Sequence, residues 1–134
     1  MVTDYCELHF VSEPGRIRTV VRCLLEFMGG YITDPDLKDD LRLILSELLN
    51  NAVVHGNKSD RTKRVYIVAE ASDGLLSVRI RDEGVGFDYK NVIKQGHMNE
   101  VLCERGRGIL LVTALTDKLS FNETGNLIQF EKRL

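Results

Sequence analysis

The chain has 134 residues, 43% of them hydrophobic and 28% charged, which is the composition of a soluble globular protein with room for one domain over residues 1–134. Its formal net charge of −2, without a basic stripe of interleaved aromatic residues, argues against a nucleic-acid partner. No run of eighteen apolar residues and no basic region followed by an apolar one occur, so we expect no membrane span, no signal peptide and a cytoplasmic location.

The N-terminal part is predicted to form a strand over residues 4–11 and then a helix. Ser12 is placed to cap that helix, and Gly29-Gly30 end it. Apolar residues at helical spacing predict its buried face: Ile17, Val20, Val21, Leu24, Leu25 and Met28. Arg18 and Arg22 then lie four residues apart on the outer face, where a solvated pair is the default interpretation.

A second helix is predicted over residues 37–57. Asp34 can cap its start with Pro35 at the first helical position, and Gly56 can end it. Its apolar stripe consists of residues at helical spacing: Leu41, Ile44, Leu45, Leu48 and Ala52.

Beside that stripe runs a polar one made of Glu47, Asn51 and His55, each four residues after the last. An amide oxygen is a suitable ligand for Mg²⁺, and a neighbouring carboxylate can serve as a general base. The alternative is a solvated helix face. His55 could approach phosphates or Glu47, or cap the end of the helix.

A charged loop over residues 57–63 leads into a predicted hairpin whose turn is Ser72-Asp73-Gly74. Leu76, Val78 and Ile80 alternate with polar residues in its second strand, so Asp82 inherits the buried face. A buried carboxylate needs a partner.

Gly84 and Gly86 follow Asp82 and leave no Cβ to block a ligand. The three residues together indicate an acceptor on the floor of a pocket with a bare backbone wall, which would suit an amine donor such as adenine. A β-turn with a charged tip is the other interpretation.

The segment 87–105 is polar and without clear periodicity, and we expect it to form a mobile lid. Gly106 and Gly108 then open an apolar helix that runs to about Asp117, and a helix start is a suitable phosphate site. Arg105 is a candidate to neutralise phosphate charge, and Arg107 is a second candidate for the same role. For either arginine, the alternative is a solvated charge without a functional role.

A last hairpin with Thr124-Gly125-Asn126 at its tip completes the chain. Helices and antiparallel strands in this order predict an α+β fold, a two-layer α/β sandwich. The three cysteines are odd in number and far apart, which indicates free thiols, with Cys23 filling the core. The three histidines lack metal-ligand spacing.

The three motifs together resemble the N, G1 and G2 boxes of the GHKL ATPases, and the resemblance covers nearly the whole chain. Within that superfamily, the segments SELLNNAVVHG, IRDEGVGF and RGRGILLV are most similar to the anti-sigma factor serine/threonine kinases. The resemblance implies the Bergerat fold, a mixed and mostly antiparallel sheet with helices on one face.

The same resemblance implies roles for single residues. Glu47 would be catalytic and Asn51 would bind Mg²⁺. The residues that would bind ATP are Asn51, Asp82, Gly84, Gly86, Arg105, Gly106 and Gly108. Arg18 matches the position at which these kinases use an arginine to contact their partners.

The implied function is that of an anti-sigma factor that binds a sigma factor and phosphorylates a serine or threonine of a STAS-type antagonist with Mg-ATP; a homodimer is an open option. No helical hairpin presents a histidine acceptor, so phosphate should go to another protein or to water. Two alternatives remain: a non-catalytic, nucleotide-dependent binding module, and an ATPase domain detached from a histidine kinase.

Overall fold

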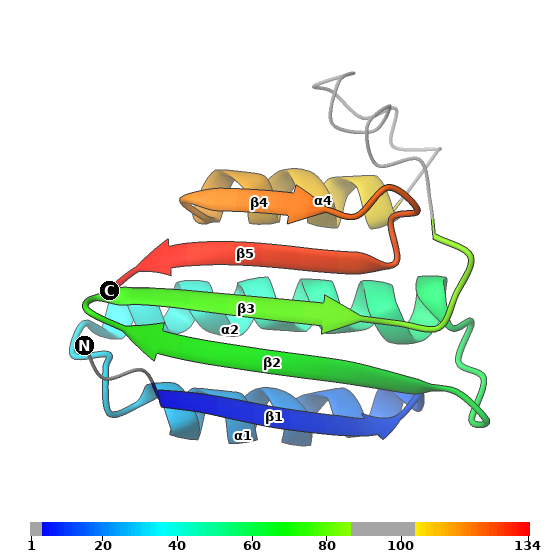
Figure 1. Ribbon diagram of the computed structural model, residues 1–134, viewed down its shortest axis with the longest axis horizontal. Coiled ribbons are helices and arrows are strands. Elements are labelled where there is room, and N and C mark those ends of the chain that lie inside the picture. The colour runs from blue at the N-terminus through cyan, green and yellow to red at the C-terminus, as the bar shows by residue number, and fades with distance from the viewer. Residues whose placement is uncertain (1–3, 87–103) are drawn as a thin grey trace.

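The computed structural model describes residues 4–86, the backbone from residue 104 and side chains from residue 108 to residue 134 (Figure 1). Its strands are β1 (Asp4–Val11), β2 (Arg64–Ser72), β3 (Leu75–Arg81), β4 (Lys118–Phe121) and β5 (Leu127–Arg133). Its helices are α1 (Ile17–Met28), α2 (Pro35–Asn50) and α4 (Glu104–Leu115), with a 3₁₀ turn at Pro14–Arg16 and a π-helical segment at Asn51–Gly56.

The five strands form one sheet in the order β1-β2-β3-β5-β4, and α1, α2 and α4 all lie on the same side of it (Figure 1). This is the predicted α+β sandwich of two layers. We expected a mixed sheet, but every pair of neighbouring strands is antiparallel.

The core lies between the sheet and the helices. Strand alternation places Ile67, Ile80 and Ile128 beside one another across β2, β3 and β5, and all three are buried. Five fully buried residues of α2 belong to the same core: Leu41, Ile44, Leu45, Leu48 and Leu49. Each such side chain stabilises the fold by about 1.5–3 kcal/mol.

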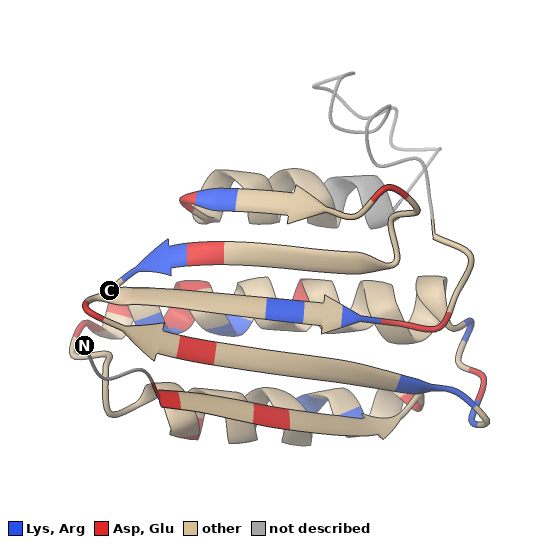
Figure 2. Cartoon of the chain, in the orientation of Figure 1, with Lys and Arg blue, Asp and Glu red and all other residues tan. Residues whose placement is uncertain are grey.

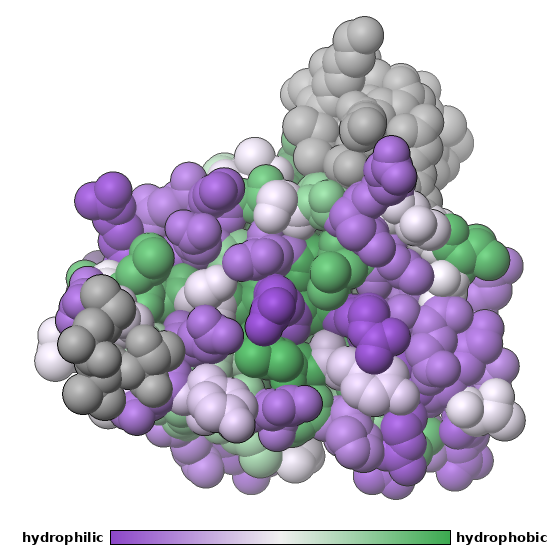
Figure 3. Space-filling model, in the orientation of Figure 1, coloured by the Kyte–Doolittle hydropathy of each residue, from purple (hydrophilic) through white to green (hydrophobic). Residues whose placement is uncertain are grey.

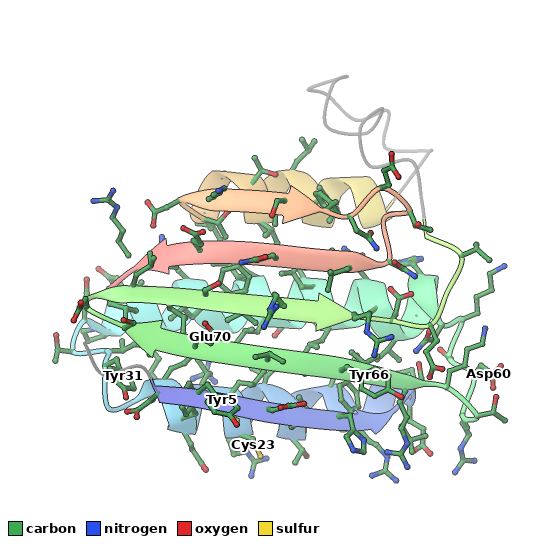
Figure 4. The ribbon with its side chains drawn as sticks, viewed as in Figure 1. Tyr5, Cys23, Tyr31, Asp60, Tyr66 and Glu70 are labelled. Atoms are coloured by element: carbon green, nitrogen blue, oxygen red, sulfur yellow. The ribbon has the colours of Figure 1, made fainter. Side chains whose placement is uncertain are left out.

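None of the described helices covers the opposite face of the sheet (Figure 1). Tyr66 and Glu70 of β2 lie on it (Figure 4), and apolar and polar side chains are mixed over its surface (Figure 3). Arg81 lies over the ring of Tyr66, with its guanidinium carbon 4.4 Å from the ring centroid.

The start of α1 differs from the prediction. Ser12 caps no helix; it is buried, and its hydroxyl donates a hydrogen bond to the carbonyl of Val53 at 3.3 Å. Pro14 begins the 3₁₀ turn instead, since its fixed φ suits a first helical position. The prediction for Cys23 was wrong, because Cys23 is exposed on the outer side of α1 (Figure 4).

The second helix begins as predicted: Asp34 accepts a hydrogen bond from the N–H of Asp36 at 2.9 Å, and Pro35 occupies the first turn. The prediction for the end of this helix was wrong. The α-helix stops at Asn50, and residues 51–56 form a π-helical segment in place of a continued α-helix. Short π-helical segments are rare and frequently lie at functional sites.

The hairpin of β2 and β3 was predicted correctly, with Asp73 and Gly74 at positive φ of 45° and 77° in its turn. The G-x-G helix begins two residues earlier than predicted, at Glu104. The predicted lid falls mostly outside the described residues. Of the helices that the structure describes, none has the length and apolar character needed to cross a membrane.

Candidate functional site

Four segments meet at one end of the sheet: the residues after β3, the π-helical segment, the β4–β5 connection and the start of α4 (Figure 1). The first three carry the residues around Asp82. The helices α2 and α4 carry the residues around Glu47.

Asp82 is buried, with 4% of its surface exposed, as strand alternation predicted. Its N–H donates to the carbonyl of Asn126 at 3.0 Å, and its carboxylate accepts from the N–H of Gly84 at 2.7 Å. A Cβ on Gly56 would lie 2.3 Å from the other carboxylate oxygen. Only a glycine lets the end of the π-helical segment come this close to Asp82.

Gly84 and Gly86 are held against the protein's own backbone. A Cβ on Gly84 would lie 2.1 Å from the carbonyl oxygen of Gly56, and one on Gly86 would lie 1.8 Å from that of Thr124. Gly86 also has a φ of +85°, which other residues rarely adopt. The sequence suggested that these glycines leave space for a ligand, but packing of three loops already requires them.

Asn57 joins the same loops and was missed in the sequence analysis. Its side chain is fully buried; it donates to the carbonyl of Arg64 at 3.0 Å and accepts from the N–H of Glu83 at 2.8 Å. The carboxylate of Glu83 in turn accepts from the N–H of Arg64 at 2.6 Å. An asparagine directly after the helix-ending glycine was the available signal, because such a side chain readily bonds nearby backbone.

Asn122 organises the β4–β5 connection and was also missed. Its side-chain oxygen accepts from the N–H groups of Gly125, Asn126 and Leu127 at 2.7, 3.0 and 3.2 Å. Asn126 then donates to the carbonyl of Gly84 at 3.3 Å. The far hairpin thereby fixes the backbone that follows Asp82.

Asn51 lies where α2 changes to the π-helical segment. Its side chain is 2% exposed, and its Nδ2 has no hydrogen-bond partner among the described residues. A buried polar group without a partner costs about 1–3 kcal/mol. The Nδ2 of Asn51 is therefore a donor that the described part of the protein leaves unsatisfied.

Glu47 is half-buried one turn earlier on α2, and α4 packs directly against it. A Cβ on Gly108 would lie 2.5 Å from Oε2 of Glu47, so a larger residue there would displace the carboxylate. The structure therefore brings together the carboxylate of the first predicted motif and the second glycine of the last one.

The other predicted site residues can be assigned to an element of the fold. His55 lies in the π-helical segment, whose i→i+5 bonds take it out of the α-helical stripe with Glu47 and Asn51. Gly106 is in the first turn of α4. Arg18 is exposed on α1. The side chains of Arg105 and Arg107 lie outside the described part.

The donor set fits a metal ion that arrives with phosphates better than one held by the protein alone. No group of three His, Cys, Asp or Glu side chains that could hold a metal occurs in the described part. Mg²⁺ is commonly bound by one or two protein ligands together with substrate phosphates and water. In such an arrangement the side-chain oxygen of Asn51 would bind the ion, and its Nδ2, which has no partner among the described residues, would be free to donate to a ligand oxygen.

Residues 10–132 match the family model for the histidine kinase-like ATPase domain. The chain is 30% identical to the serine-protein kinase RsbW of Bacillus subtilis (strain 168) over 98% of this chain and 86% of that protein. It is 30% identical to the anti-sigma F factor of Priestia megaterium over 80% of each protein. The match to the anti-sigma F factor of Shouchella clausii, at 44% identity, spans 46% of this chain and 44% of that protein.

Proposed function

Because the chain belongs to the family of histidine kinase-like ATPase domains, we propose that it is an ATP-dependent anti-sigma factor and protein serine/threonine kinase. It would bind a sigma factor and phosphorylate a serine or threonine of an antagonist protein. The kinase activity in this proposal rests on one observation, the close packing of Gly108 against Glu47 next to the buried side chain of Asn51. Nucleotide binding alone does not need that carboxylate.

In this proposal, the segments around Asp82 select the base. The carboxylate of Asp82 accepts a hydrogen bond from the amino group of adenine, a position that is a carbonyl in guanine. The hydrogen bond from Gly84 and the close approach of Gly56 hold the carboxylate in place. Selectivity for ATP over GTP follows, because the carbonyl of guanine is an acceptor and would face the carboxylate of Asp82 without a proton between them.

Asn51 would hold Mg²⁺ together with the phosphates, and the ion would supply neutralisation of the charge that develops during transfer. Gly106 and Gly108 let the start of α4 approach the phosphates. Arg105, or its rival Arg107, would add positive charge from the start of the same helix.

Glu47 would take the proton from the attacking hydroxyl of the acceptor. The hydroxyl oxygen then forms a bond to the γ-phosphorus, and the bond from that phosphorus to the oxygen of the β-phosphate breaks. ADP leaves with the electron pair of that bond, and Glu47 holds the proton. Gly108 positions the carboxylate by excluding any larger side chain from this side of it.

The partners belong to the same proposal. Arg18, exposed on α1, would contact both the sigma factor and the antagonist, so that the two compete for one surface. The protein would act in the cytoplasm, as a single domain over residues 1–134, and a homodimer is compatible with it.

The test separates binding from chemistry. Glu47→Gln should leave ATP affinity within about twofold of the wild type and lower phosphate transfer to the antagonist by about 10²–10⁴, the usual contribution of a positioned base. Calorimetry gives the affinity and radiolabelled ATP gives the transfer rate. Glu70→Gln, the same substitution on the opposite face of the sheet, is the control. Wild-type transfer by Glu47→Gln would exclude Glu47 as the base, and no transfer by the wild type would favour a non-catalytic binding module.

A further inference from the structure

A groove of about 1130 Å³ lies between α1 and α2 and does not belong to the segments around Asp82. Its floor is apolar, from Ile17, Val21 and Leu25 of α1. Its walls carry four basic side chains, all of them exposed: Arg18 and Arg22 on α1, and Lys38 and Arg42 on α2. Figure 2 marks basic segments on both helices.

The basic side chains of the groove are not neutralised by the described part of the protein. No carboxylate there lies within the 4.0 Å of an ion pair from any of the four, and the ion pairs that do occur involve Arg16, Arg61 and Arg79. Glu26 and Glu47 also line the groove, which leaves a surplus of two positive charges from four cations and two carboxylates. Such a surplus over an apolar floor favours an acidic chain with some apolar side chains.

The groove leads to the proposed base. The hydroxyl of Ser12, just before α1, bonds to Val53, just after α2, so the two helices run in opposite directions. Arg18 therefore faces the end of α2 that carries Glu47 and Asn50, both of which line the groove. Glu47 thus borders the groove on one side and Gly108 on the other.

We propose that this groove binds an acidic segment of the phosphate acceptor and delivers its hydroxyl to Glu47. The inference rests on the proposed kinase function, and it adds Arg22, Lys38 and Arg42 as the residues that recognise the acceptor. The occupant is the acceptor because, of the partners proposed, only a substrate has to reach Glu47. The nucleotide enters from the side of Gly108 and Asp82 and does not occupy the groove.

The experiment uses two fluorescent peptides of equal length, each with one serine and two leucines. Four glutamates flank the serine in one peptide and four glutamines in the other. Fluorescence anisotropy with the full chain should show at least tenfold tighter binding of the glutamate peptide. Arg22→Glu combined with Arg42→Glu should weaken that binding at least tenfold, and each single reversal should weaken it in part, while Lys118→Glu, a single charge reversal on β4 outside the groove, should not.

The milder pair Arg22→Gln and Arg42→Gln repeats the measurement in case the charge reversals do not fold. Equal binding of both peptides, no effect of either pair, or an equal effect of Lys118→Glu would overturn the proposal. Displacement of the peptide by a non-hydrolysable ATP analogue would also overturn it, since the groove would then bind nucleotide. ATP affinity is measured by calorimetry on the same proteins, so a failure of the nucleotide site is seen separately from a failure of the groove.

Discussion

The two ends of the candidate site are built in opposite ways. Around Asp82, the protein satisfies its own polar groups, and three loops are joined through Asn57, Asn122 and Asn126. Around Glu47, the Nδ2 of the neighbouring Asn51 is buried without a partner among the described residues. The first region makes its hydrogen bonds within the protein, whereas the second keeps an unmet donor for a ligand. Substitutions in the two regions should therefore affect stability and binding in different proportions.

The largest effect on stability is expected from Gly86→Ala. The substitution forces a side chain into a φ of +85° and places its Cβ 1.8 Å from the carbonyl oxygen of Thr124. We expect a loss of about 3 kcal/mol in the free energy of unfolding, the upper end for one strained residue. Urea denaturation measures it, and Gly15→Ala, where a Cβ meets nothing within 4 Å, is the control. Equal stability of the two variants would show that these loops are not tightly joined.

Asn57→Ala should have the next largest effect. It removes the two hydrogen bonds that Asn57 makes to Arg64 and Glu83 and leaves only the direct one between those residues, at a cost of about 1–3 kcal/mol for the groups left unpaired. Because Glu83 follows Asp82 directly, ATP affinity should fall with stability. Denaturation and calorimetry on one sample test both, with Asn50→Ala, on the exposed side of α2, as the control. A loss of affinity without a loss of stability would give Asn57 a direct role in binding.

Asn51→Ala should have the smallest effect on stability and could even raise it by about 1 kcal/mol, because it removes a buried polar atom without a partner. Mg²⁺-dependent ATP binding should nevertheless be lost. Stability measured without nucleotide, together with calorimetry with and without Mg²⁺, tests this inverse relation. A large loss of stability in the absence of nucleotide would mean that the two regions are built alike.

Much of this arrangement could be predicted from the sequence, because it depends on local periodicity. Strand alternation placed Asp82 on the buried face, and helical spacing placed Glu47 beside the apolar stripe of α2. The sequence could not show why the glycines are needed, since their neighbours, Gly56 and Thr124, come from distant parts of the chain. It also could not show Asn57 as a connection, because that role depends on where β2 and the residues after β3 meet.

The hydrophobic periodicity could not predict how α2 ends, for a different reason. A regular 3.6-residue repeat continues through residues 51–56, so the pattern predicts an α-helix over the whole segment. The observed change to π-helical bonding depends on tertiary contacts that fix its end, among them the approach of Gly56 to Asp82. For Arg18, the sequence predicted that the side chain is exposed. It could not predict the groove beside Arg18, because that groove depends on how α1 and α2 pack.

The π-helical segment also restricts how this protein can change its length during evolution. Each residue of a helix rotates the chain around the helix axis, by about 100° in an α-helix and by somewhat less in a π-helix, whose bonds run from i to i+5. Deleting one residue between Asn51 and Gly56 would therefore turn Gly56 and Asn57 away from Asp82 and Glu83. Insertions and deletions in this segment would break the site, so relatives that share the site should keep the same spacing between the asparagine and the glycine.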